Sequence, residues 1–122
     1  YGQTLMGNLM LTIVDLQCGL WPRGEVPKEF HEPVHSDLPV LLMSGERDPV
    51  TPPVYAAQTA ETFPNSLNLV ARGQAHSVMK IACLRDITTE FIDKGSVENL
   101  DTSCVANIRP SPFFTSLLGP EP

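Results

Sequence analysis

Apolar residues are most concentrated in the middle of the chain, where residues 40–43 read Val-Leu-Leu-Met without a polar interruption. An uninterrupted run of this kind is typical of a strand buried on both faces, as in a parallel sheet covered by helices. We therefore predict a strand over residues 38–44, closed by Gly45. A second, half-polar run, Leu-Asn-Leu-Val-Ala at residues 67–71, predicts another strand.

A helical pattern follows the first predicted strand. Thr51 can cap a helix whose first positions are Pro52 and Pro53, where a missing backbone N–H costs nothing. We expect this helix to reach about residue 63 before Pro64 and Asn65 stop it. Its packed side is predicted to include Ala56, Ala57, Ala60 and Phe63.

A longer helical pattern follows the second predicted strand, over about residues 78–94, with Ser77 or His76 at its start. It ends in Lys94 and Gly95, a basic last turn and a glycine suited to a left-handed cap. One stripe carries Ile81, Leu84, Ile87 or Thr88, and Phe91. The order strand, helix, strand, helix predicts a right-handed parallel crossover and an α/β fold class.

The two flanks give weaker patterns. Residues 1–20 space Leu5, Met6, Leu9, Met10, Ile13 and Leu16 close to the helical period, which favours a helix with one apolar face. The alternative is a strand, because Leu11, Thr12 and Val14 fill the other face. Residues 21–37 are proline-bearing and predict an irregular surface connector. We thus expect one partial domain with an N-terminal segment and connector (1–37), a core (38–95) and an irregular tail (96–122), in which Phe113 and Phe114 anchor the tail onto the core.

Charge and hydropathy narrow the function classes. The 122 residues carry a formal net charge of -6, which disfavours a nucleic-acid partner because such binding depends on clustered lysine and arginine. The apolar run at residues 9–14 is too short to span a bilayer, so no membrane span is expected. No signal-peptide pattern is visible, and the first residue is Tyr1 rather than methionine, which suggests a processed product or a fragment.

Residues 31–35, His-Glu-Pro-Val-His, fit the letter of the H-E-x-x-H zinc pattern, in which both histidines lie on one face of a continuous helix. Pro33 lacks a backbone N–H and clashes with a preceding helical turn, so His31 and His35 cannot be held at that geometry. We predict an exposed loop here, without bound metal.

An acid and a histidine occupy matching positions in the predicted sheet. Asp48 follows the first strand and His76 follows the second, and in a parallel sheet such loops meet at the carboxyl ends of the strands. A carboxylate beside an imidazole fixes its tautomer and stabilises the imidazolium that forms when the ring takes a proton from a serine. Taken singly, Asp48 before Pro49 could be a turn former and His76 an exposed loop residue; together they predict a catalytic pair.

The cysteines leave two readings open. Cys18, Cys83 and Cys104 are too widely spaced for a CxxC metal or redox motif. Either all three are reduced thiols, or two of them pair and one is left over.

The run at residues 39–53, which contains Ser-Gly-Glu-Arg-Asp-Pro-Val-Thr-Pro, resembles the C-terminal region of the tripeptidyl aminopeptidase-like branch of the α/β-hydrolases. Four further segments lie where that branch has similar residues: Cys-Gly-Leu-Trp-Pro at 18–22, Gly-Gln-Ala-His at 73–76, Cys83, and Asp-Thr-Ser-Cys at 101–104. The resemblance covers roughly residues 15–115. It implies the C-terminal part of an α/β-hydrolase fold, with parallel strands alternating with helices and a disulfide-tied irregular tail.

The resemblance also implies a function. It indicates a serine peptidase, related to prolyl aminopeptidases, that acts near free N-termini, with Asp48 as the acid of the triad and His76 as the general base. It implies a disulfide between Cys83 and Cys104, a partner for Cys18 outside this chain, and a secreted or periplasmic protein. No cofactor is implied; the expected partners are a peptide or small amide or ester substrate and an N-terminal hydrolase portion.

The nucleophile of such an enzyme is absent from this sequence. None of the eight glycines is followed two positions later by serine, so no G-x-S-x-G elbow exists. We therefore expect the chain to supply two of three catalytic groups and to be inactive alone. The alternative is a non-catalytic remnant or interaction module of hydrolase origin.

Overall fold

The computed structural model describes residues 7–110, 112–114 and 116–119, and the chain divides into two units, one ending at Glu32 and one beginning at Pro33. In the first unit, α1 (Leu9–Leu20) is the helix expected from the apolar spacing, although Leu5 and Met6 lie outside the described residues. Every residue of α1 is exposed, so its apolar side chains are not packed. A short 3-10 helix, η1 (Lys28–His31), interrupts the otherwise irregular connector.

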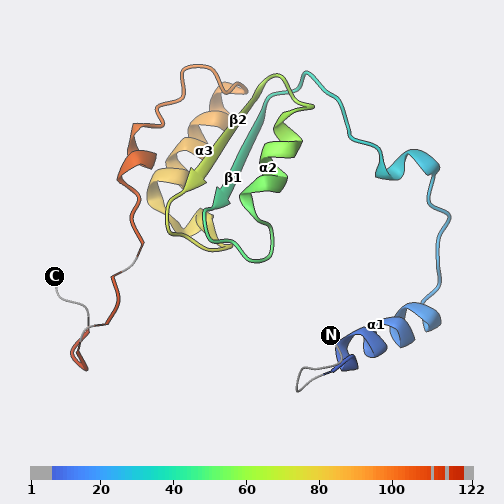
Figure 1. Cartoon of the computed structure of the whole chain (residues 1–122). Helices are drawn as coiled ribbons and strands as arrows, with labels where there is room; N and C mark the ends of the chain where they lie inside the picture. Colours follow the sequence, from blue (N-terminus) through green and yellow to red (C-terminus); the bar gives the residue numbers. More distant parts are fainter. Residues whose placement is uncertain (1–6, 111, 115, 120–122) are drawn as a thin grey trace. The chain divides into compact units, whose positions relative to one another are not determined.

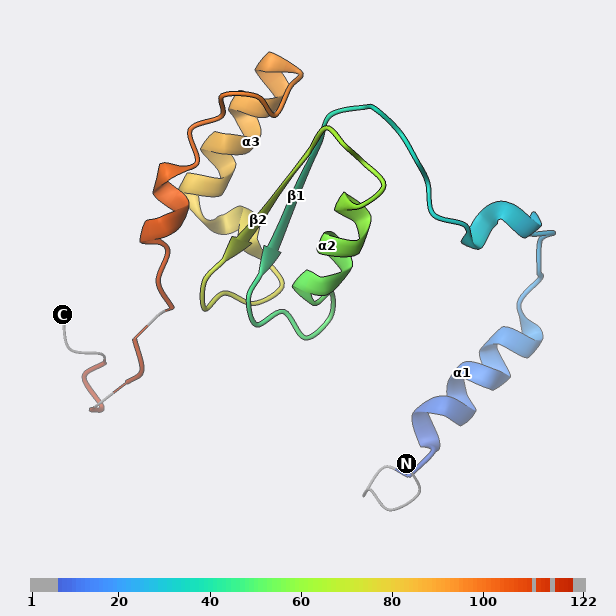
Figure 2. The same ribbon diagram turned by 45° about the horizontal axis from the view of Figure 1, so that its top comes forward.

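The second unit contains a parallel pair of strands with a helix on either side. The two predicted strands are present: β1 (Val40–Gly45) pairs in parallel with β2 (Ser66–Ala71), in a register that aligns Val40 with Ser66 and Gly45 with Ala71. β1 begins two residues later than predicted and includes Gly45, and β2 begins one residue earlier. The helices α2 (Pro53–Ala60) and α3 (Ala82–Lys94) lie on opposite sides of this pair (Figures 1 and 2). The handedness of the crossover stays a prediction.

The core lies between the strands and α3. Its buried members are Leu69, Ala71, Val78, Leu84, Ile87 and Ile108. Alternate residues of a strand face one side of a sheet, so Leu41 and Met43 of β1 join Leu69 and Ala71 of β2 on this face. The predicted stripe of α3 is confirmed at Leu84 and Ile87, which are its two buried residues.

The burial predicted for β1 on both faces is wrong. Residues 40–43 are only half-buried, and full burial begins at Ser44 and Gly45. In the described part of the chain β1 has one strand neighbour, β2, so its other edge carries no pairing strand. An apolar run can therefore indicate a strand correctly while the number of neighbouring strands decides how deeply it is buried.

The predicted helix bounds need three corrections. α2 is capped by Pro52 rather than Thr51 and ends at Ala60, and Ala57 is exposed. The last helix does not run unbroken from residue 78, because η2 (Val78–Lys80) and an extended Ile81 precede α3. Its end is as predicted, with Gly95 in the left-handed conformation at φ 61°.

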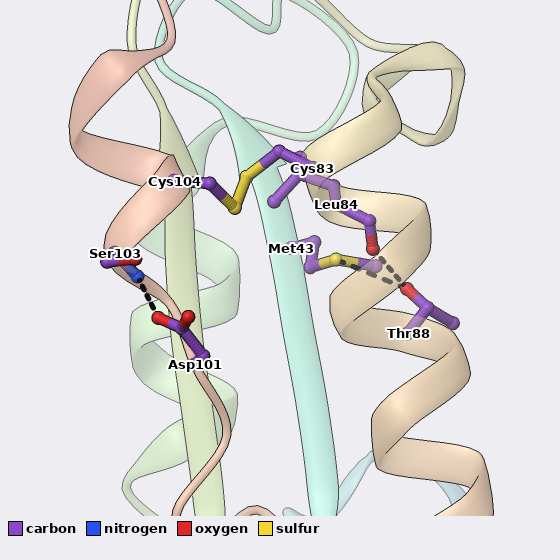
Figure 3. Close-up of a disulfide and its surroundings, with 7 residues drawn as sticks. All are labelled: Met43, Cys83, Leu84, Thr88, Asp101, Ser103 and Cys104. Carbon is purple, nitrogen blue, oxygen red and sulfur yellow. Dashed lines mark hydrogen bonds between the residues drawn. A yellow bond between two sulfur atoms is a disulfide. The ribbon is translucent and has the colours of Figure 1, made fainter.

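The tail is attached by a disulfide and one buried residue rather than by its two phenylalanines. Cys83 of α3 and Cys104 of η3 (Ser103–Asn107) form a disulfide with a Cα–Cα distance of 5.9 Å, which confirms the implied pairing (Figure 3). Ile108 is buried in the core, whereas Phe113 and Phe114 are 85% and 79% exposed, so the predicted anchor is wrong. Aromatic character alone predicted contacts that the chain path does not make.

Candidate active site

Asp48 is held by the turn that follows β1. Its backbone N–H donates to the Gly45 carbonyl oxygen over 3.1 Å, which closes the turn. Its Oδ1 accepts hydrogen bonds from the backbone N–H groups of Val50 at 2.8 Å and Thr51 at 3.0 Å. With only 2% of its side chain exposed, Asp48 is a buried carboxylate whose orientation is set by local backbone donors.

His76 reaches Asp48 because the loop after β2 lies against the turn after β1. The backbone N–H of Arg47 donates to the Gln74 carbonyl oxygen at 2.9 Å, and that of Glu46 donates to the Ala71 carbonyl oxygen at 3.0 Å. A side chain at Gly45 would overlap the Ala75 carbonyl oxygen. Glycine at this position therefore permits the close approach of the two loops.

The structure brings the two predicted site residues into direct contact. His76 Nδ1 lies 3.0 Å from Asp48 Oδ2 and 3.2 Å from Oδ1, within hydrogen-bond reach of both oxygens. The histidine side chain is 55% exposed, in contrast to its buried partner. A neutral ring in this contact donates through Nδ1–H, which leaves Nε2 as the unprotonated nitrogen.

Thr51, predicted as a helix cap, instead belongs to the site. The Thr51 hydroxyl donates to Asp48 Oδ2 at 2.8 Å, and the Thr51 Oγ1 lies 3.3 Å from His76 Nδ1. The predicted helix cap at this residue is therefore replaced by a contact with both members of the pair. A threonine three residues after an acid can reach back to that carboxylate, and this spacing was the available signal.

The hydrogen bonds around Asp48 decide its charge state. Burial by itself raises the pKa of this carboxyl, but the N–H and hydroxyl of Thr51, the N–H of Val50 and the His76 ring all stabilise the ionised form. The hydrogen bonds outweigh the burial, so the pKa of Asp48 lies well below its usual range. At neutral pH, Asp48 is therefore ionised and places a negative charge beside His76.

Other candidate positions do not meet the geometry that their chemistry needs. His31 is the last residue of η1 and Glu32 is extended at φ -79° and ψ 145°, so no continuous helix carries His31 and His35. Across residues 7–110 and the short described stretches that follow, no three His, Cys, Asp or Glu side chains gather as metal ligands. Cys18 is exposed on α1 and has no disulfide partner among the described residues.

A protein-family model described as TAP-like protein matches residues 3–104. The chain belongs to the TAP-like family of α/β-hydrolases. The matched region contains both strands, Asp48, His76 and the two disulfide cysteines. No curated protein and no solved structure is significantly similar to the chain.

Among the described residues of this TAP-like chain, no helix is long and apolar enough to cross a membrane.

The ionised Asp48 should make the stability of this TAP-like chain depend on pH. Its folded pKa lies below the unfolded value of about 3.9, so its stabilising effect is complete above that pH and is lost as the pH falls toward the folded pKa. We expect Asp48→Asn to lower the free energy of unfolding at pH 7, and the gap from wild type to shrink below about pH 4. Urea denaturation at several pH values measures this gap.

The matched control is Asp86→Asn, which removes one negative charge from an exposed position on α3. Its effect on stability should be small at pH 7, because substitutions at exposed sites without partners rarely exceed about 0.5 kcal/mol. A gap between wild type and Asp48→Asn that widens on acidification would contradict the prediction.

Proposed function

We propose that this chain supplies the acid and the general base of a Ser-His-Asp serine hydrolase that releases residues or short peptides from free N-termini. The observation that carries the proposal is the 3.0 Å contact between His76 Nδ1 and the buried Asp48 Oδ2. Each residue follows one of two adjacent parallel strands, the position from which α/β enzymes present catalytic groups.

In the proposed reaction, Asp48 keeps the Nδ1–H tautomer of His76 and leaves Nε2 free to accept a proton. The serine hydroxyl loses its proton to Nε2 as its oxygen attacks the scissile carbonyl carbon. The imidazolium, stabilised by the Asp48 carboxylate, then passes that proton to the leaving amine as the carbon–nitrogen bond breaks. Water completes the cycle by the same proton route and releases the acyl product.

The serine is proposed to come from outside these 122 residues, since the chain has no G-x-S-x-G motif. The exposed His76 ring is compatible with this arrangement, because a base whose partner lies on another segment must present Nε2 at a surface. The preference for free N-termini rests on the resemblance to tripeptidyl aminopeptidases. The Cys83–Cys104 disulfide supports a secreted or periplasmic location, where such bonds persist.

The test compares the isolated chain with a longer polypeptide that supplies the serine elbow. We expect the longer polypeptide to hydrolyse aminoacyl or tripeptidyl chromogenic amides, to react with a fluorophosphonate, and to act weakly on the same amides with blocked N-termini. The 122-residue chain should neither hydrolyse the amides nor react with the fluorophosphonate. Hydrolysis by the isolated chain that His76→Ala abolishes would show that its nucleophile is internal. A folded longer polypeptide that neither cleaves amides nor reacts would favour a non-catalytic module instead.

A further inference from the structure

The loop that carries His76 is supported from a second side by the C-terminal tail. The Gln74 side chain donates through Nε2 to the Arg109 carbonyl oxygen at 2.8 Å. One residue earlier, Gly73 adopts φ +67° and lies so close to Pro110 that an added Cβ would stand 2.6 Å from the proline ring. The tail therefore contacts this loop two to three residues before His76.

The supporting segment of the tail is itself fixed in place. Ile108, next to Arg109, is 8% exposed and belongs to the core. The Arg109 guanidinium donates to the Ala106 and Ile108 carbonyl oxygens at 2.6 and 3.0 Å, which braces the chain after η3. Cys104 at the start of this segment is bonded to Cys83 of α3 (Figure 3). The Arg109 carbonyl is thus a fixed acceptor rather than part of a loose end.

Gln74 is held from the opposite side by the turn that carries Asp48. Its carbonyl oxygen accepts from the Arg47 N–H at 2.9 Å, while the neighbouring Gly73 N–H donates to the Glu46 carboxylate at 2.7 Å. Gln74 therefore connects the acid-bearing turn with the tail, and His76 is two residues away. A shift of this loop by about 1 Å would take Nδ1 out of hydrogen-bond range of Asp48 Oδ2.

We infer that Gln74 is a positioning residue that keeps His76 Nδ1 on Asp48 by fastening the His76 loop to the disulfide-tied tail. The inference rests on the proposed function for its catalytic meaning, but its geometric content can be measured in the 122-residue chain. Gln74 touches no reacting atom in this role. It limits the positions that the imidazole can adopt.

The experiment reads the tautomer of His76 by nitrogen-15 NMR of the isotopically labelled chain at about pH 8. The hydrogen bond to Asp48 selects the Nδ1–H tautomer, so this form should predominate in the wild type. Gln74→Ala should lower the ratio of Nδ1–H to Nε2–H roughly fivefold, the factor that corresponds to the loss of one net hydrogen bond. Gln58→Ala, at an exposed glutamine of α2, is the matched control and should leave the ratio unchanged.

Gln74→Glu provides a second variant, because a carboxylate fills the same space but cannot donate to the Arg109 carbonyl. A ratio within about twofold of wild type in either folded variant would overturn the inference. Unfolding of both variants would also overturn it, since Gln74 would then be needed for the fold rather than for one ring. Asp48→Asn separates the two proposals. If this substitution leaves the tautomer ratio of His76 unchanged, Asp48 does not select the tautomer, and the proposed function is contradicted together with the inference.

Discussion

Asp48→Asn should lower the turnover number of a complete hydrolase containing this chain by about 10⁴-fold. An asparagine can keep the acceptor for the Val50 and Thr51 N–H groups, so the turn after β1 should persist. Its amide would instead donate toward His76 Nδ1, and the ring would have to carry its proton on Nε2. That tautomer cannot accept the proton of serine, which is the physical reason for the large effect.

The measurement is the hydrolysis rate of a tripeptidyl chromogenic amide, with Asp86→Asn as the matched variant at an exposed position of α3. The control should retain activity within about twofold, because it removes the same charge away from any assigned contact. A loss that is confined to kcat, with KM nearly unchanged, would indicate an interaction made in the transition state. An Asp48→Asn enzyme that keeps more than about a tenth of its activity would refute the assigned role of this carboxylate.

Removal of the disulfide should have the largest effect on stability. Cys83 and Cys104 are 21 residues apart, and a crosslink that closes a loop of this length stabilises a folded domain by about 3 kcal/mol. We therefore expect Cys83→Ala with Cys104→Ala to lower the free energy of unfolding by about that amount. The urea midpoint of the double variant, compared with the wild type, measures the loss.

Cys18→Ala is the matched control, because Cys18 is exposed and forms no disulfide in the described part of the chain. Its unfolding free energy should stay within about 0.5 kcal/mol of wild type. A double variant that loses less than about 1 kcal/mol would show that Ile108 and the contacts of η3 hold the tail without the crosslink.

The contrast in exposure between Asp48 and His76 fits the roles proposed for them. Asp48 is 2% exposed and held by backbone donors, so its carboxylate would not have to reorient during the proposed reaction. His76 is 55% exposed, so its free nitrogen can meet a group from another segment. The arrangement suits a base that must be rigid on one side and accessible on the other.

The sequence by itself determined the elements that depend on local chemistry. The apolar run at 40–43 identified β1, and Gly95 identified the end of α3. Both signals lie within a few consecutive residues: an apolar run is typical of a strand, and glycine readily adopts the left-handed conformation that ends a helix. It also placed Asp48 and His76 after successive strands. The resemblance carried by several short motifs indicated the family and the Cys83–Cys104 pairing, both of which are confirmed.

Only the tertiary structure decided which residues meet. The parallel register sets Gly45 beside Ala71, and this alignment brings Asp48 to His76 and turns Thr51 from a helix cap into a partner of both. Ile81 breaks the last predicted helix, which lets Val78 and Leu84 enter the same core. Gln74 gained its partner from a tail 35 residues away. Such contacts depend on the path of the whole chain, and no local pattern of residues specifies that path.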